Sequence, residues 1–166
     1  MKPGTRVASV PAEVVVEQLG ESFDTLELSR VALRLGVAAV LGALIGIERE
    51  WMRKAAGLRT HTTVALASAT FVMIINEGDA ASDGISRVIQ GITAGIGFLG
   101  AGTILKGNSA ETISGLTTAA TIWLTAAIGA AAGAGHVDVA VLSVIAALVT
   151  LSLFTLVERM IGTARD

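Results

Sequence analysis

The ionisable side chains that could carry chemistry in this chain lie mostly at the ends of long apolar runs. Arg34 lies just inside the first run, and Glu48 closes it. Arg59 precedes the second run, and Asp83 and Arg87 precede the third. Charges placed this way are typical of membrane boundaries, and they form no nucleophile–base set, phosphate loop or carboxylate dyad. We therefore expect a protein that is not an enzyme, with these residues as candidate binding positions.

Two of these charges have alternative interpretations at the outer ends of their helices. Arg34 shares one helix face with Gly42 and Gly46, because residues four apart are neighbours on a helix. Its side chain can snorkel to the membrane surface, or it can pair with an acid inside the bundle, for which Asp83 is the candidate. Asp83 can also act as a first-turn acid paired with Arg87, or belong to a polar site at the outer mouth.

A second polar group is expected at the opposite ends of these helices. Thr60 and Thr118 begin two apolar runs and are plausible N-caps. Two helix N-termini that converge there would favour an anion, and Thr118 is the candidate residue. Glu48 and His61 could instead ligate a cation, and a simple boundary of snorkelling charges is the alternative to both. The sequence does not identify a metal.

Composition places the chain in a membrane. Of its 166 residues, 52% are hydrophobic and 16% are charged, whereas soluble domains have about 25% charged residues. The absence of cysteine excludes disulfides, Cys-ligated zinc and thiol catalysis. A net charge of −2 without a basic block predicts no nucleic-acid partner, and no motif predicts a cofactor.

Five apolar runs predict an all-α polytopic membrane bundle of about five transmembrane helices. The runs are 29–47, 62–76, 88–105, 115–134 and 137–157. The second is shorter than the roughly 20 residues that a bilayer requires, unless its helix begins near Thr60. The chain accordingly divides into a polar or amphipathic segment (1–27), a transmembrane domain (28–160) and a cytoplasmic tail (161–166).

Lysine and arginine predict the orientation. The loop 48–61 carries four of them and the loop 77–87 carries one. By the positive-inside rule the first loop is cytoplasmic, so the N-terminus is outside and the C-terminus inside. A re-entrant second run would place the C-terminus outside instead.

Glycine is concentrated in the third run, where the residues 91–105 read GITAGIGFLGAGTIL. Small residues let transmembrane helices approach closely, so we expect this helix near the centre of the bundle, or locally broken. The faces available for tight crossings also predict self-association. The expected helix-packing positions are Gly42, Gly46, Gly91, Gly95, Gly97, Gly100 and Gly102.

An internal repeat is indicated by an offset of 58 residues. The segment that begins Gly57-Leu58 then aligns without gaps with the segment that begins Gly115-Leu116. A parallel repeat of two helices, related by an axis along the membrane normal, would follow.

Four segments resemble the MgtC/SapB family of membrane proteins. They are GALIGIERE (42–50), AGLRTH (56–61), GIGFLGAG (95–102) and GLTTAATIWLTAAIG (115–129). Asp83 and Arg87 are similar to the acid and arginine that this family carries before its third helix. The resemblance covers the membrane domain only, without the soluble C-terminal domain of longer members, and the family's glutamine after that arginine falls on Gly91.

The resemblance implies a bacterial inner-membrane protein that acts in magnesium homeostasis, in adaptation to low magnesium and, in pathogens, in intracellular survival. It implies action by binding and regulating another membrane protein, with the membrane sector of the F-type ATP synthase among the partners. The alternative is a transporter or channel for magnesium or another small ion.

Overall fold

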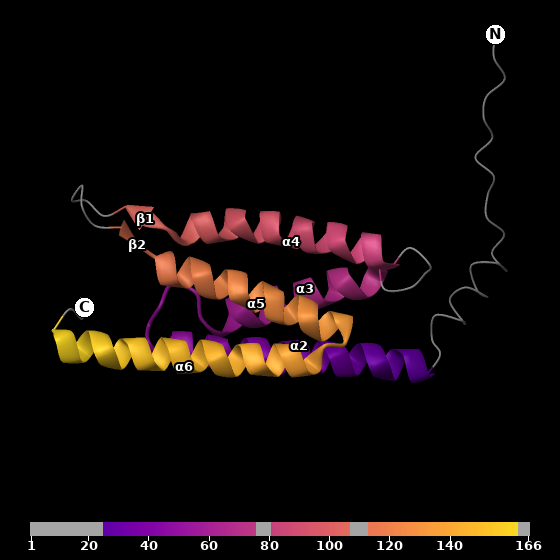
Figure 1. The fold of residues 1–166 in the computed structure, drawn as a ribbon, viewed down its shortest axis with the longest axis horizontal. Coiled ribbons are helices and arrows are strands. Elements are labelled where there is room, and N and C mark those ends of the chain that lie inside the picture. Colours follow the sequence, from indigo (N-terminus) through magenta and orange to yellow (C-terminus); the bar gives the residue numbers. More distant parts are fainter. Residues whose placement is uncertain (1–24, 76–80, 107–112, 163–166) are drawn as a thin grey trace, which may run out of the picture. The chain divides into compact units, whose positions relative to one another are not determined.

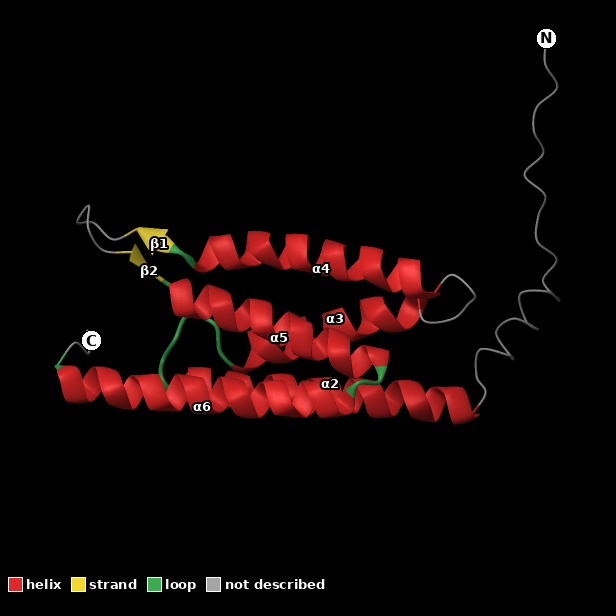
Figure 2. Ribbon diagram, viewed as in Figure 1, coloured by secondary structure: helices red, strands yellow, loops and turns green. Residues whose placement is uncertain are grey.

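The computed structural model describes residues 25–75, 81–106 and 113–162. They form five helices and one pair of two-residue strands (Figures 1 and 2). In chain order these are α2 (Thr25–Trp51), α3 (Leu58–Ile75), α4 (Ala81–Thr103), β1 (Leu105–Lys106), β2 (Ile113–Ser114), α5 (Leu116–Ala134) and α6 (Val137–Ile161). The contacts divide the chain into two units, 1–33 and 34–166, and the packing below concerns the second unit.

The predicted all-α membrane bundle is confirmed. Among the described helices, α2, α3, α5 and α6 are long and apolar enough to cross a membrane, judged by length and composition. Helices α2, α3 and α4 begin before their predicted apolar runs and α6 ends after its run, because backbone hydrogen bonding continues into polar residues that hydropathy excludes, whereas α5 lies within its run. The short second run thus becomes an 18-residue helix that starts at Leu58. The prediction for residues 1–27 falls almost wholly outside the described residues.

The core is built where α3 meets glycines on two neighbouring helices. A Cβ atom added to Gly42 of α2 would lie 2.8 Å from the Ala65 Cβ, and one added to Gly129 of α5 would lie 2.7 Å from the Ala65 Cα. Gly46 approaches Leu58 just as closely. Hydrogen in place of a side chain lets the backbones of α2 and α5 contact α3. The surrounding core joins buried residues of α2, α3, α5 and α6.

The glycine-rich helix α4 lies elsewhere than expected. The helix packs against α5 and α3, and within the described chain Ile96 and Gly100 are its buried residues (Figure 1). A Cβ atom added to Gly91, Gly95 or Gly97 would meet nothing within 4 Å, and the same holds for Gly102. The expectation of a central position was therefore wrong for the single chain, because α2 and α5 supply the glycines that pack its core.

The internal repeat has a counterpart in the packing. Gly42 lies against His61 in the α2–α3 pair, and Gly100 lies against Ala119 in the α4–α5 pair. Each residue of the second contact stands 58 positions after its equivalent in the first. The two helix pairs thus place equivalent glycines against equivalent neighbours, which supports the predicted repeat.

Replacing one glycine by alanine tests this packing, because the sign of the effect depends on the site. Gly129→Ala forces a Cβ against the backbone of Ala65, and we expect it to lower the free energy of unfolding by about 1–3 kcal/mol. Gly97→Ala has open space and should raise it by up to about 1 kcal/mol, the gain in helix propensity. Far-UV circular dichroism during titration with sodium dodecyl sulfate measures both. Equal midpoints would contradict the close contact.

Candidate functional site

A buried polar cluster lies where α2 ends and α3 and α5 begin. Arg49 is only 3% exposed, because it extends the buried face of α2 that runs through Ala38, Gly42 and Ile45. The cluster comprises Glu48, Arg49, His61, Thr118 and Thr121. Sequence reasoning placed Glu48 and Thr118 among the candidate residues. It left Arg49 at the membrane boundary, although its spacing from Gly42 and Gly46 would have placed it on the inward face.

The charges of this cluster are incompletely paired. Arg49 Nη1 lies 3.6 Å from Glu48 Oε2, which is an ion pair but too long for a hydrogen bond. Within the described chain, both Glu48 carboxylate oxygens and the Arg49 Nε and Nη2 atoms are buried and lack hydrogen-bond partners. Both charges act electrostatically on the His61 imidazole. Because removing one partner of such a pair leaves a buried charge uncompensated, these two side chains depend on each other.

His61 connects α3 to α5 through its imidazole ring. The residue is completely buried. Its Nδ1 donates to the Gly57 carbonyl oxygen at 2.9 Å, and its Nε2 lies 3.4 Å from Thr121 Oγ1. The Thr121 hydroxyl donates to the Thr118 carbonyl oxygen at 2.9 Å. A hydroxyl has one proton, so Thr121 can serve that carbonyl or an unprotonated His61 Nε2, but not both. Rotation of the Thr121 hydroxyl would replace its hydrogen bond within α5 by one from α5 to His61 of α3.

The helix starts beside this cluster are capped differently from the prediction. The Leu58 backbone N–H at the start of α3 donates to Glu50 Oε2 at 3.1 Å, across the turn from α2. Helix α5 has Gly115 as its N-cap, with a φ of 90° and no side-chain cap. Thr60 and Thr118 lie inside α3 and α5, so the prediction that they are N-caps was wrong. The carboxylate of Glu50 satisfies the first donor of α3, and this partner lies eight residues earlier in the chain.

At the other end of the bundle, Arg34 binds the C-terminus of α5. Its Nη1 donates to the Gly133 carbonyl oxygen at 3.0 Å. The helix ends there at Gly135, whose φ is 88°. A cation at a helix C-terminus is favoured by the helix dipole. This capping role differs from both alternatives for Arg34, snorkelling and pairing with an acid. Asp83 lies in α4, with its side chain outside the described part of the chain.

The remaining candidates stand apart from the cluster. Arg59 is exposed in the first turn of α3, and Arg87 is exposed on α4. The structure therefore brings Glu48 and Thr118 near His61, whereas Arg34 lies at the opposite end of α5. Within the described residues, no three His, Asp or Glu side chains gather in a way that could hold a metal ion.

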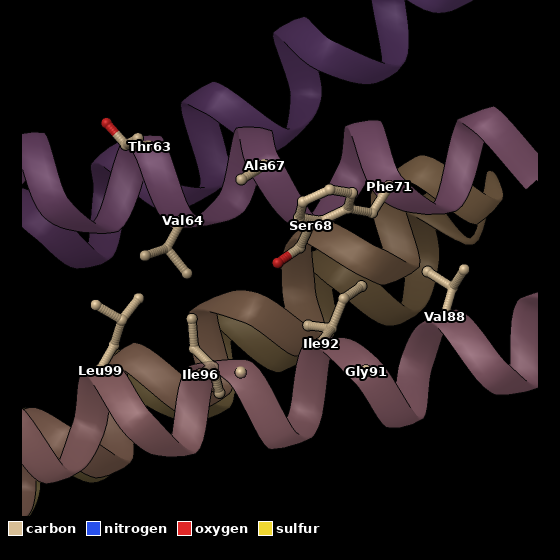
Figure 3. Close-up of a pocket in the computed structure, with 11 residues that line it drawn as sticks. Thr63, Val64, Ala67, Ser68, Phe71, Val88, Gly91, Ile92, Ile96 and Leu99 are labelled. Atoms are coloured by element: carbon tan, nitrogen blue, oxygen red, sulfur yellow. The ribbon is translucent and has the colours of Figure 1, made fainter.

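An apolar groove of about 570 Å³ separates part of α3 from α4. Gly91 and Gly95 lie along its α4 side, and Val64 and Ile96 extend toward it from opposite helices (Figure 3). The full lining is Thr63, Val64, Ala67, Ser68, Phe71, Val88, Gly91, Ile92, Gly95, Ile96 and Leu99. A second groove of about 370 Å³ lies between α5 and α6; its surface is mostly apolar, and its lining includes Thr117, Thr121, Ser143 and Thr150.

Removing one charge of the buried pair should cost more than removing both. Glu48→Gln leaves Arg49 without its counter-charge, so we expect the free energy of unfolding to fall by about 3 kcal/mol. In the double variant Glu48→Gln/Arg49→Met, the free energy of unfolding should fall by less than the sum of the decreases in the two single variants. A double-mutant cycle in mixed micelles measures this coupling. Additive effects would show that the two charges are energetically independent.

Replacing Arg34 should loosen the end of α5. Arg34→Met removes a charged donor to the Gly133 carbonyl, and such a loss costs about 1.5–3 kcal/mol. Arg34→Lys keeps a cation near the helix C-terminus and should lose less. Amide hydrogen exchange at Ala131–Gly135 should accelerate in the methionine variant. Unchanged exchange would mean that Arg34 does not cap this helix.

Comparison with known proteins identifies the relatives of this chain. The model of the MgtC family matches residues 35–160. Protein SrpB of Synechococcus elongatus is 45% identical over 141 residues, which are 78% of each chain. Protein MgtC of Brucella abortus is 45% identical over 124 residues, 72% of this chain and 50% of that protein.

A further relative is the putative magnesium transporter YhiD of Escherichia coli K12. It is 40% identical over 129 residues, which are 74% of this chain and 59% of YhiD. The chain thus spans about half the length of the MgtC protein and more than half of YhiD. No solved structure matches. The family match over the described helices, together with these relatives, shows that this chain belongs to the MgtC family of membrane proteins.

Proposed function

We propose that this protein lies in the bacterial inner membrane and acts in magnesium homeostasis by binding and regulating another membrane protein, without catalysis. The membership of the MgtC family and the relative named as a putative magnesium transporter support the link to magnesium. The basic loop between α2 and α3 would face the cytoplasm, with the N-terminus outside and the C-terminus inside.

The observation that carries the regulatory role is the groove between α3 and α4. Its walls are apolar and two of its positions, Gly91 and Gly95, have no side chain (Figure 3). In a bilayer, helices associate through close contact at such small residues. A transmembrane helix of a partner would therefore fill the groove. Arg87 is exposed and directly precedes Val88, the first residue that α4 contributes to the lining, so its charge would help to orient that helix.

There are two candidate occupants of this groove. The family resemblance makes the membrane sector of the F-type ATP synthase a candidate partner. A second copy of this chain would give the self-association that the small-residue faces predict. Both use the same physical contact, so filling the groove should weaken either association.

An ion transporter is the second candidate function, and one observation favours it. The groove between α5 and α6 is mostly apolar, but its lining includes Thr121, which lies beside the buried His61. A path through this groove would lead toward the buried polar cluster that contains Glu48. The charge of Arg49 next to that carboxylate opposes a cation there, however, and this repulsion favours the regulatory role.

Filling the groove tests the proposal in inverted membrane vesicles. We expect the protein to slow ATP-driven proton pumping without changing the passive leak of protons or magnesium. Gly91→Leu/Gly95→Leu has space for its Cβ atoms within the chain but blocks a docking helix, and it should weaken binding about tenfold. Gly97→Leu, which is open but outside the groove, is the matched control and should still slow pumping.

A different result would favour transport. A proton or magnesium leak that appears with the protein and disappears in Glu48→Gln or Asp83→Asn would contradict the regulatory role. Slowed pumping that survives in the groove-filled variant would place the regulatory contact on another surface.

A further inference from the structure

The turn that ends α2 has an arginine where helices usually have glycine. The Arg53 N–H donates to the Glu50 carbonyl oxygen and the Lys54 N–H donates to the Arg49 carbonyl oxygen, both at 3.0 Å. This pattern closes a helix through a residue in the left-handed conformation. Arg53 is that residue, with a φ of 51°.

The same chain uses glycine for this purpose elsewhere. Gly135 ends α5 with a φ of 88°, and Gly162 follows α6 with a φ of 71°. A Cβ atom disfavours the left-handed conformation, whereas glycine adopts it freely. Within the described residues Arg53 is the non-glycine residue with positive φ. An observed departure of this kind points to a function for the side chain.

The side chain of Arg53 belongs to a basic surface on the loop 51–59. Arg53, Lys54 and Arg59 are exposed, and none of them has an ion pair within the described part of the chain. Arg49 is buried, and Glu50, which precedes the loop, is exposed and keeps its negative charge while it accepts from the Leu58 N–H. The three exposed cations outnumber this one acid. The accessible charge of this loop is therefore positive.

The loop is also fixed by contacts with the helix bundle. Ala56 is 3% exposed and belongs to a core cluster with Val64 and Ile96. The Gly57 carbonyl oxygen accepts hydrogen bonds from the His61 backbone N–H and ring Nδ1. These contacts fix the loop against the bundle, so its cations are presented without a large cost of ordering.

We propose that the loop 51–59 binds the phosphate groups of anionic phospholipids in the leaflet that it faces. The loop joins α2 to α3, two membrane-spanning helices, so it lies at the level of the lipid headgroups. Trp51 is 80% exposed at the end of α2, where aromatic side chains anchor at the interface. Arginine is suited to phosphate, because its planar guanidinium can donate two parallel hydrogen bonds. This surface is separate from the groove of the proposed function.

Tryptophan fluorescence can report the lipid beside this loop. The chain has two tryptophans, so the full-length Trp123→Phe protein leaves Trp51 as the reporter. The protein is reconstituted in vesicles of equal phosphatidylglycerol and phosphatidylcholine, with either one or the other brominated as a quencher. We expect stronger quenching when phosphatidylglycerol is brominated. The ratio of the two quenching values measures enrichment of the anionic lipid.

Arg53→Gly separates lipid binding from folding. It relieves the left-handed strain, so the thermal unfolding midpoint should not fall, while the anionic-lipid enrichment should fall by up to about fivefold for the lost cation. Lys54→Gln and Arg59→Gln should lower the enrichment similarly. Arg30→Gln, an exposed arginine near the other end of α2, is the matched control and should leave it unchanged.

Four results would overturn the proposal. They are equal quenching by the two lipids in chloride, an unchanged enrichment in Arg53→Gly, an equal loss in Arg30→Gln, and equal quenching accompanied by an unfolding midpoint that rises when inorganic phosphate replaces chloride at constant ionic strength. The last result would identify a site for a free anion rather than for a lipid.

Discussion

The contact of Ala65 with two glycines is the constraint on which the rest of the bundle depends. Gly42 approaches Ala65 from α2 and Gly129 approaches it from α5, so three helix backbones meet around one small side chain. Lipid tails are as apolar as leucine, so the hydrophobic effect does not drive these helices to associate with one another. Close backbone contact supplies dispersion energy instead. A larger residue at any of the three positions would separate the helices.

The polar ends of the bundle depend on this contact for their alignment. With α3 held between α2 and α5, His61 comes within 3.4 Å of Thr121 at one end. At the other end, Arg34 comes within 3.0 Å of the Gly133 carbonyl oxygen. Hydrogen bonds between membrane helices contribute about 0.6 kcal/mol each on average. Such bonds therefore fix the register of helices that the glycines have already brought together.

Much of the fold could be predicted from the sequence, because hydropathy and glycine spacing are local patterns. The helices lie near the predicted apolar runs, and Gly42 lies at a tight crossing. The position of α4 could not be predicted in the same way. A glycine shows that another helix can approach closely, but it does not show which helix does so. The close contact with α3 that we expected from the glycines of α4 is made by Gly129 of α5 instead.

The candidate site was less predictable, since its contacts join distant segments. The Glu50 carboxylate caps α3 from across a turn, whereas the sequence pattern favoured Thr60. The interaction of His61 with Thr121 spans 60 residues. The burial of Arg49 follows from helix periodicity, but composition alone suggests an exposed boundary charge.

The repeat gives the groove between α3 and α4 a further meaning. Gly95 stands 58 residues after Val37, which packs against the core that joins α2, α3, α5 and α6. The second pair therefore lacks a side chain that the first pair supplies from its own sequence. Gly95 lines the groove, so at this position the wall of the groove is bare backbone. A molecule that enters the groove would therefore contact helix backbone at a position where the first half of the repeat carries a valine side chain.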